Sequence, residues 1–181
     1  MPNYRRAFVP GGCWFFTVTL LDRGSTALVD HIDPLRRATA WTRRRYPFQI
    51  DAAVVLPDHL HAVWTLPPGD ADFSIRWRMI KTRFVQALAP TECRSPVGIA
   101  RGERGIWQRR FWEHLIRDER DYARHVEYCY INPVKHGLVR RVVDWPFSSF
   151  HRDVRAGVFP EDWAGEEDAT GKFGERDEPR S

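Results

Sequence analysis

Short runs of apolar, β-branched and aromatic residues alternate along the chain with longer segments of helical periodicity. The first run, CWFFTVTLL at 13–21, follows two glycines and is typical of a buried strand. By the same criteria four strands are expected, at 13–21, 50–56, 59–66 and 106–116. Helices are expected at 33–45, 73–88 and 118–132, the first opened by Asp33-Pro34 and the last ended by Pro133.

These elements follow one another in the order β-α-β-β-α-β-α. Two βαβ-like halves predict an α+β fold, the ferredoxin-like or RRM-like sandwich of an antiparallel sheet with helices on one face. The third helix and a C-terminal extension lie outside this frame, so that helix is able to approach the sheet. We expect one domain over 1–164 and a disordered acidic tail over 165–181.

Composition is that of a globular protein with a hydrophobic core. Hydrophobic residues make up 43% and aromatic residues 13% of the 181 positions, which excludes global disorder. No apolar run reaches the roughly 18–20 residues of a membrane span, and the N-terminus lacks the apolar segment of a secretory signal. Three widely spaced cysteines match neither a disulfide framework nor a zinc pattern. We therefore expect a cytoplasmic protein.

Charge adds a candidate partner. The net charge is +4, but 165–181 carries six acids and three bases, so the rest of the chain carries +7. Only three of the 28 cations are lysines, and arginine suits phosphate recognition. A high-GC genome would also raise the arginine count, without any role in phosphate binding. The basic body makes nucleic acid a reasonable expectation, with association to the nucleoid through DNA.

A histidine pair is the first candidate site. His59 and His61 are two residues apart in an expected strand, so their imidazoles project from the same face. Neighbouring neutral imidazoles are a natural start for a divalent metal site. The alternative is two histidines on an exposed sheet face, which the spacing alone does not exclude.

The third helix carries the complementary candidates. Tyr122, Val126, Cys129 and Tyr130 share one side of it, which we interpret as the core face. Asp121, His125, Tyr128 and Asn132 share another side, with Tyr128 and Asn132 one turn apart. Should this polar side meet the histidine pair, Asn132 would supply a third ligand and Tyr128 a nucleophile toward phosphate. The alternative for Tyr128 is an ordinary half-buried helix tyrosine.

Several motifs, in one order, resemble a known family. The run LPDHLH at 56–61 resembles the His-hydrophobe-His strand of the HUH single-strand nucleases, and HVEYCYINPVKHG at 125–137 resembles the tyrosine helix of the REP-associated tyrosine transposases. Further matches are YRR at 4–6, GG at 11–12, WFFT at 14–17, WQRRFWEH at 107–114 and DWPFSSF at 144–150. The likeness extends from residue 4 to about residue 165.

The resemblance implies a DNA-cleaving and rejoining enzyme. Tyr128 corresponds to the nucleophile that forms a 5′-phosphotyrosine and releases a 3′-hydroxyl, and His59, His61 and Asn132 correspond to the metal ligands. Related insertion-sequence transposases usually have Gln at the third ligand, and Asn is the REP-associated variant. The ion would be Mg²⁺ or Mn²⁺, polarising the scissile phosphate. The partner would be a single-stranded REP-type palindromic hairpin, and the family favours a monomer.

Candidate DNA contacts are less sharply indicated. They are basic, glycine or aromatic residues within the matched motifs: Arg5, Arg6, Gly11, Gly12, Trp107, Arg109, Arg110 and Lys135. Trp107, and equally Trp112, would stack on unpaired bases, with core packing as the alternative role. The two arginines fall in the expected fourth strand, where one must face away from the core. The glycine pair permits close backbone approach to a ligand, or simply a bend before the strand.

Two other functions fit parts of the pattern. One is a non-catalytic nucleic-acid-binding module on the same sandwich, but such modules display aromatic residues where this chain has two histidines. The other is a metal-dependent hydrolase that uses water as the nucleophile. It would need a general base, for which Asp58 and Asp121 are the obvious candidates.

Overall fold

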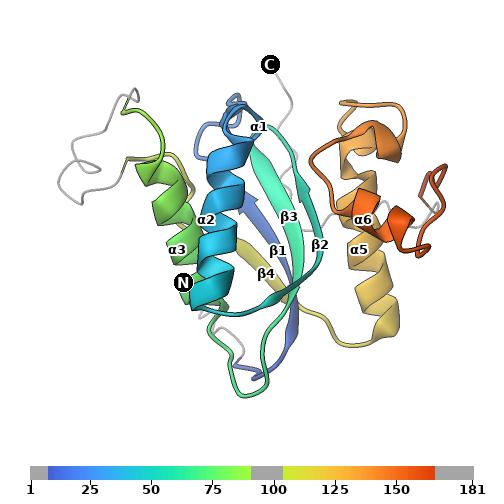
Figure 1. Ribbon diagram of the computed structural model, residues 1–181, viewed down its shortest axis with the longest axis horizontal. Coiled ribbons are helices and arrows are strands. Elements are labelled where there is room, and N and C mark those ends of the chain that lie inside the picture. The colour runs from blue at the N-terminus through green and yellow to red at the C-terminus, as the bar shows by residue number, and fades with distance from the viewer. Residues whose placement is uncertain (1–7, 91–103, 166–181) are drawn as a thin grey trace, which may run out of the picture.

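A four-stranded sheet forms the centre of the computed structural model, which describes residues 8–90 and 104–165 (Figure 1). The strands are β1 (Cys13–Thr19), β2 (Gln49–Val55), β3 (His59–Thr65) and β4 (Trp112–Leu115), in the spatial order β2-β3-β1-β4. Every neighbouring pair is antiparallel. The predicted ferredoxin-like α+β fold is confirmed.

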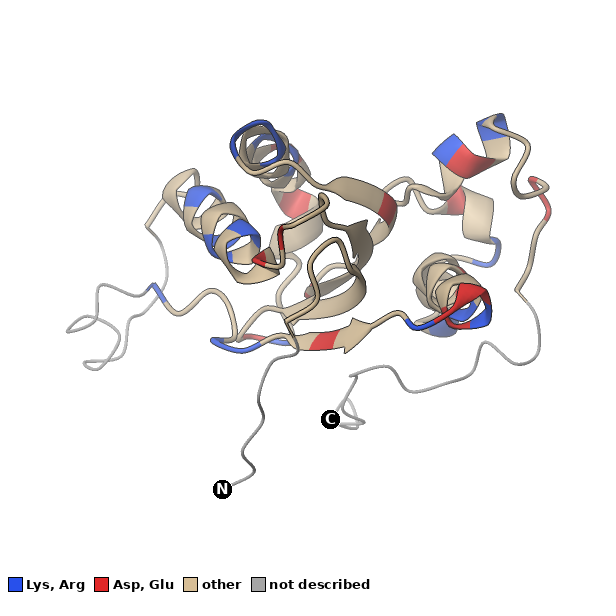
Figure 2. Ribbon diagram, turned by 90° about the horizontal axis from the view of Figure 1, so that it is seen from below, with Lys and Arg blue, Asp and Glu red and all other residues tan. Residues whose placement is uncertain are grey.

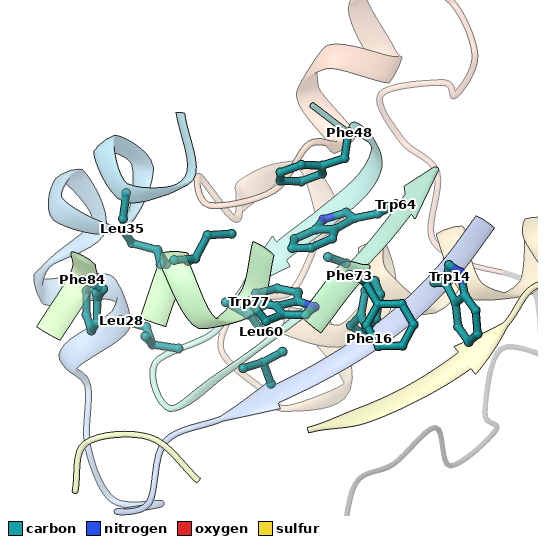
Figure 3. Close-up of a cluster of buried hydrophobic side chains, with 14 of the residues drawn as sticks. Trp14, Phe16, Leu28, Leu35, Phe48, Leu60, Trp64, Phe73, Trp77 and Phe84 are labelled. Carbon is teal, nitrogen blue, oxygen red and sulfur yellow. The ribbon is translucent and has the colours of Figure 1, made fainter. Parts of the chain in front are cut away.

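Helices α2 (Ile32–Arg45) and α3 (Phe73–Gln86) cover one face of the sheet, with the short α1 (Ala27–Asp30) leading into α2 (Figure 1). The core beneath them is aromatic (Figure 3). Trp64 of β3 and Trp77 of α3 stack with ring centroids 4.1 Å apart. Alternate strand residues enter this core because successive side chains of a strand point to opposite faces. The other set of alternate residues is therefore presented to the opposite face.

Helix α5 (Glu119–Lys135) packs on that opposite face, against β2 and β3 (Figure 1). The carboxylate of Asp118 caps its first turn by accepting the backbone N–H of Asp121. Cys129 and Tyr130 are buried, as the periodicity predicts, whereas Tyr122 is 37% exposed and its prediction as a core residue is wrong. Tyr122 has the right helical angle but lies in the first turn of α5, where its ring stays partly exposed.

Pro133 lies inside α5, so the predicted helix end at Asn132 is also wrong. Proline removes one helical hydrogen bond, but bonding resumes after it: the N–H of His136 donates to the Asn132 carbonyl and the N–H of Leu138 to the Pro133 carbonyl, each at 2.9 Å. Pro133 is buried, and packing sustains the extra turn that the local rule disfavours. As a result Lys135 remains on the same helix as Tyr128.

The fourth strand is shorter than predicted and covers only Trp112–Leu115. Trp107 makes an isolated bridge with Leu20, after which the chain leaves the sheet until β4 begins. An unbroken strand would place Arg109 on the same face as Trp107 and Phe111, both of which pack against the aromatic core. Because the chain leaves the sheet before Arg109, the arginine side chain stays exposed. The expectation that Arg109 and Arg110 belong to a strand is wrong for this reason.

The C-terminal extension, with the 3₁₀ turn η1 (Val142–Asp144) and α6 (Phe150–Arg155), covers the edge of β2. The Val55 N–H donates to the Phe147 carbonyl and the Ser149 N–H to the Ala53 carbonyl, both at 2.8 Å. An exposed strand edge is a template for unwanted pairing, and the extension occupies it. Residues 144–150 thus have a structural role.

Among the described helices, none has the length and hydropathy needed to cross a bilayer.

Candidate active site

The histidine pair lies at the start of β3 on the face covered by α5. His59 and His61 are 1% and 0% exposed, and their ring centroids are 5.0 Å apart. Alternation along the strand directs both rings to the same side, as predicted. The alternative of two histidines on an exposed sheet face is excluded by their burial.

Each imidazole is oriented through its Nδ1 atom. His59 Nδ1 lies 2.8 Å from Oδ1 of Asp58, whose other oxygen pairs with Arg23 at 2.8 Å. His61 Nδ1 lies 2.9 Å from the hydroxyl of Thr17, the residue directly opposite on β1. Metal-binding histidines commonly use one nitrogen in this way and ligate through the other. Nε2 would therefore be the ligating atom of both rings.

The carboxyl of Asp58 is suited to this orienting role. Burial raises its pKa, but the hydrogen bond from His59 and the charges of His59 and Arg23 lower it, and the net result is a pKa below the ordinary value. Asp58 is thus a carboxylate that accepts the His59 N–H. Since it is already engaged by His59 and Arg23, it is a poor candidate for a general base.

Helix α5 brings Tyr128 to the histidines. The Tyr128 ring is fully buried, 5.2 Å from the His61 ring and 5.9 Å from the Phe15 ring between centroids. Tyr128 projects toward the sheet because the polar side of α5, not only its apolar side, is packed inward. The ring of His136, just past the helix end, lies 5.2 Å from His59. Sequence reasoning did not assign His136 to this site, since a proline was expected to end the helix before it.

Asn132 lies one turn after Tyr128 and is fully buried. Its Nδ2 donates to the Tyr128 carbonyl at 3.4 Å, while its Oδ1 is buried without a hydrogen-bond partner among the residues that the structure describes. A buried amide oxygen of this kind is costly unless a ligand satisfies it. Two oriented imidazoles and this oxygen are a donor set that fits Mg²⁺ or Mn²⁺.

Lys135 contacts the candidate nucleophile itself. Its ammonium Nζ donates to the Tyr128 hydroxyl at 3.3 Å and lies 4.7 Å from the centre of the Tyr128 ring. The sequence placed Lys135 among DNA contacts. The structure adds this second relationship, because α5 continues through Pro133 and keeps Lys135 on the same helix as Tyr128, two turns away.

A second group with metal-ligand chemistry lies between β4 and the start of α5. Suitable ligand atoms of His114, Asp121 and His125 all lie within 4.8 Å of one another. Asp121 binds His114 at 2.8 Å and accepts the Arg117 backbone N–H at 3.0 Å. Asp121, the second candidate for a general base, is therefore already engaged within this cluster. Sequence reasoning placed Asp121 and His125 on one helix side but did not include His114.

The other predicted contacts are scattered. Trp107 packs edge to face on Phe84 in the helix-covered core, away from Tyr128. Gly11 has a φ of +70°, and a Cβ on Gly12 would lie 2.8 Å from Nε1 of Trp14, so local geometry by itself explains both glycines. Arg109 and Arg110 are exposed. Arg5 and Arg6 lie outside the described residues.

An antiparallel sheet that presents paired imidazoles to a tyrosine on a covering helix defines the class of the HUH tyrosine enzymes. A REP-associated tyrosine transposase of Escherichia coli (strain K12) is 52% identical over 166 residues, which span 92% of this chain and 93% of that protein. A Haemophilus influenzae relative described with the same family name is 51% identical over 170 residues, 93% of this chain and 96% of its own. The chain belongs to the family of REP-associated tyrosine transposases.

A solved structure supports the same assignment. The REP-associated tyrosine transposase bound to a REP hairpin is 51% identical, with a TM-score of 0.85 over 99% of this chain and 100% of its own. No family model matches the chain. The expected enzyme class, tyrosine transposase, is confirmed by these relatives.

Proposed function

We propose that this transposase cleaves and rejoins single-stranded DNA at REP-type palindromic hairpins, with Tyr128 as its nucleophile. The observation that carries the proposal is the position of Tyr128, 5.2 Å from His61 and hydrogen-bonded to Lys135. The solved relative that is bound to a REP hairpin supports the choice of substrate.

The proposed cleavage exchanges one phosphate ester for another. The Tyr128 oxygen, having released its proton to solvent, forms a bond to phosphorus, and the bond from phosphorus to the 3′-oxygen breaks. The 3′-oxygen takes a proton from water, and a 5′-phosphotyrosine remains. Rejoining reverses both bond changes, with a 3′-oxygen attacking and the tyrosine leaving. Because the ester is never hydrolysed, the bond energy is conserved for strand transfer.

Lys135 acts at the oxygen where charge develops. Its ammonium donates to the Tyr128 hydroxyl, so it stabilises the phenolate before cleavage and the departing phenolate during rejoining. His59, His61 and Asn132 would hold Mg²⁺ or Mn²⁺, which when bound would polarise the scissile phosphate. Asp58 and Thr17 keep the two imidazoles directed to that task through the Nδ1 contacts.

Phosphate binding would fall to arginine and lysine residues. We assign this role to exposed Arg109 and Arg110, to Lys135, and to Arg5 and Arg6 in the N-terminal segment. Further Lys and Arg residues are distributed along α2 and α3 (Figure 2). The domain limits of 1–164, the separate tail, the monomeric state and the cytoplasmic location stay predictions.

The two alternative functions have less support. RNA-recognition-type modules bind through an open sheet face, whereas here α2 and α3 cover one face and α5 covers β2 and β3 on the other. A hydrolase would need a free carboxylate near the histidines. Asp58 and Asp121 are each held by a histidine and a further N–H donor or cation.

Covalent capture tests the proposal. A 5′-labelled strand cannot report a 5′-phosphotyrosine, so the hairpin oligonucleotide carries its label on the 3′ side of the cleavage point. The parent protein should give a denaturant-resistant labelled adduct, and Tyr128→Phe should bind the hairpin but give no adduct. Tyr130→Phe is the matched control, because the Tyr130 hydroxyl bonds Asp153 and Ser149 on the extension instead. An adduct in the Tyr128→Phe protein would exclude Tyr128 as the nucleophile.

A further inference from the structure

The edge strand β4 carries a layered stack of rings on the sheet face that holds His61 and Tyr128. The indole of Trp112 and the imidazole of His114 are parallel within 3°, with centroids 5.8 Å apart. The His114 ring in turn stacks on that of His125, with centroids 4.6 Å apart and ring planes 17° apart. The Phe15 ring contacts two further rings, with centroids 4.8 Å from that of His125 and 5.9 Å from that of Tyr128. The stack thus runs from the surface at Trp112 to the side of the candidate nucleophile.

One carboxylate holds the middle of the stack in place. Asp121 Oδ2 lies 2.8 Å from Nε2 of His114, and Oδ1 lies 3.1 Å from Nδ1 of His125. These residue types would suit a divalent ion. The lone pair of an imidazole nitrogen lies in the plane of its ring, however, so two stacked rings cannot both direct one at the same ion. The structure instead supports a clamp that sets the orientation of the imidazole beneath Trp112.

The strand register places Trp112 on a direct line with the candidate active site. Trp112 is paired with Thr17 of β1, and Thr17 is paired with His61 of β3. Residues directly opposite in neighbouring strands project from the same face. Two strand spacings separate Trp112 from His61, about 10 Å. That distance matches about three stacked nucleotides at 3.4 Å each.

We propose that Trp112 is the platform on which an unpaired base of the single-stranded substrate stacks, one to three nucleotides from the scissile phosphate. The inference rests on the proposed function and adds to it the position of a base-binding subsite. Trp112 is 37% exposed, whereas Trp107, the other candidate from the sequence, packs in the opposite core. Stacking is sequence-tolerant, because every base has a π-face.

Base stacking can be measured without cleavage. The Tyr128→Phe protein is mixed with hairpin oligonucleotides in which 2-aminopurine replaces one unpaired nucleotide at a time. We expect its fluorescence to change strongly at one or two adjacent positions. Adding Trp112→Ala should remove that change and weaken binding about 5- to 150-fold, whereas Trp112→Phe should retain most of both.

The control is Tyr122→Ala, which removes an aromatic ring of the same 37% exposure from the first turn of α5. It should leave both the affinity and the fluorescence signal unchanged. Thermal unfolding of each variant reports whether the fold is retained. If the alanine variant unfolds, Trp112→Phe still tests the platform, because it keeps an aromatic ring at this position. Parent-like binding and fluorescence in Trp112→Ala would overturn the platform. A protein that binds the hairpin but forms no adduct in the capture experiment would overturn the proposed function instead.

Discussion

The ammonium of Lys135 lies 3.3 Å from the hydroxyl of Tyr128, two turns apart on the same helix. A cation in this position would favour the phenolate, which is the form that attacks phosphorus in the proposed mechanism. It also lies 4.7 Å from the ring centre, so the contact involves the whole side chain of the tyrosine. Lys135 is therefore in position to act on the proposed chemistry as well as on the predicted DNA contact.

Replacing Lys135 with methionine should slow cleavage about 100-fold in single turnover, since one donor to a developing oxyanion is lost. The rate of Lys135→Met should go on rising at alkaline pH where that of the parent has levelled off, because the phenolate forms at higher pH without a neighbouring cation. Lys135→Arg, which keeps the charge, should recover much of the rate. A loss that disappears at saturating DNA, with an unchanged pH profile, would show that Lys135 only binds the phosphate backbone.

The two histidine groups should differ in their effect on metal dependence. His59→Ala and His61→Ala should each abolish cleavage at low Mn²⁺ or Mg²⁺ and recover part of it at high concentrations, because the remaining ligands bind the ion weakly. His114→Ala should leave the half-saturating metal concentration of cleavage unchanged. EDTA should stop the parent reaction, and either ion should restore it. Full activity in excess EDTA would remove the metal from the mechanism.

Stability should fall as the pH drops below about 6.5, in part through His125. Burial lowers the pKa of His125, although the Asp121 carbonyl and carboxylate act against burial, and His114 and Arg124 add to the lowering. Above the unfolded-state pKa of about 6.5, His125 is neutral in the folded and in the unfolded protein. Below it the unfolded chain takes up a proton first, which favours unfolding. The slope for one proton is at most about 1.4 kcal/mol per pH unit.

Denaturant unfolding at pH 5 to 8 measures this dependence. His125→Gln should flatten the slope, and His31→Gln, at an exposed position, should leave it as in the parent. An equal slope in His125→Gln would contradict the assignment to His125.

The extension should stabilise the site helix measurably. Phe150 is fully buried and packs against Tyr130 of α5 and Trp163, so Phe150→Ala should cost about 3–5 kcal/mol of unfolding free energy. Val158→Ala removes an apolar group that is 66% exposed in the same extension and should change stability by no more than about 0.5 kcal/mol. Similar costs for the two variants would show that the extension is not part of the core.

Binding of hairpin DNA should depend steeply on salt. The logarithm of the association constant should fall with the logarithm of salt concentration by about 0.7 per phosphate contacted in a single strand. Arg110→Ala should lower that slope by one contact without changing which unpaired bases are preferred.

Competition against fully duplex DNA at fixed salt checks the substrate: equal cleavage of hairpin and duplex would indicate a nonspecific nuclease.

Local patterns in the sequence predicted the first three strands, the helices that became α2 and α3, and the key residue pairs. The two-residue spacing of His59 and His61 predicts a shared face because a strand has a period of two, whatever packs on it. The four-residue spacing of Tyr128 and Asn132 likewise places them on one side of any α-helix. Such spacings depend only on backbone geometry, which is why they were predictable without the rest of the molecule.

Tertiary structure decided how these local units meet. Only packing places the polar side of α5 on the histidines, extends the helix past Pro133 and so brings Lys135 to Tyr128. Only the sheet register aligns Trp112 with His61 across β1. These relationships join segments far apart along the chain, as from His61 to Tyr128, 67 positions apart, or from Thr17 to Trp112, 95 positions apart. They arise from burial summed over many contacts, and no short window of sequence contains that information.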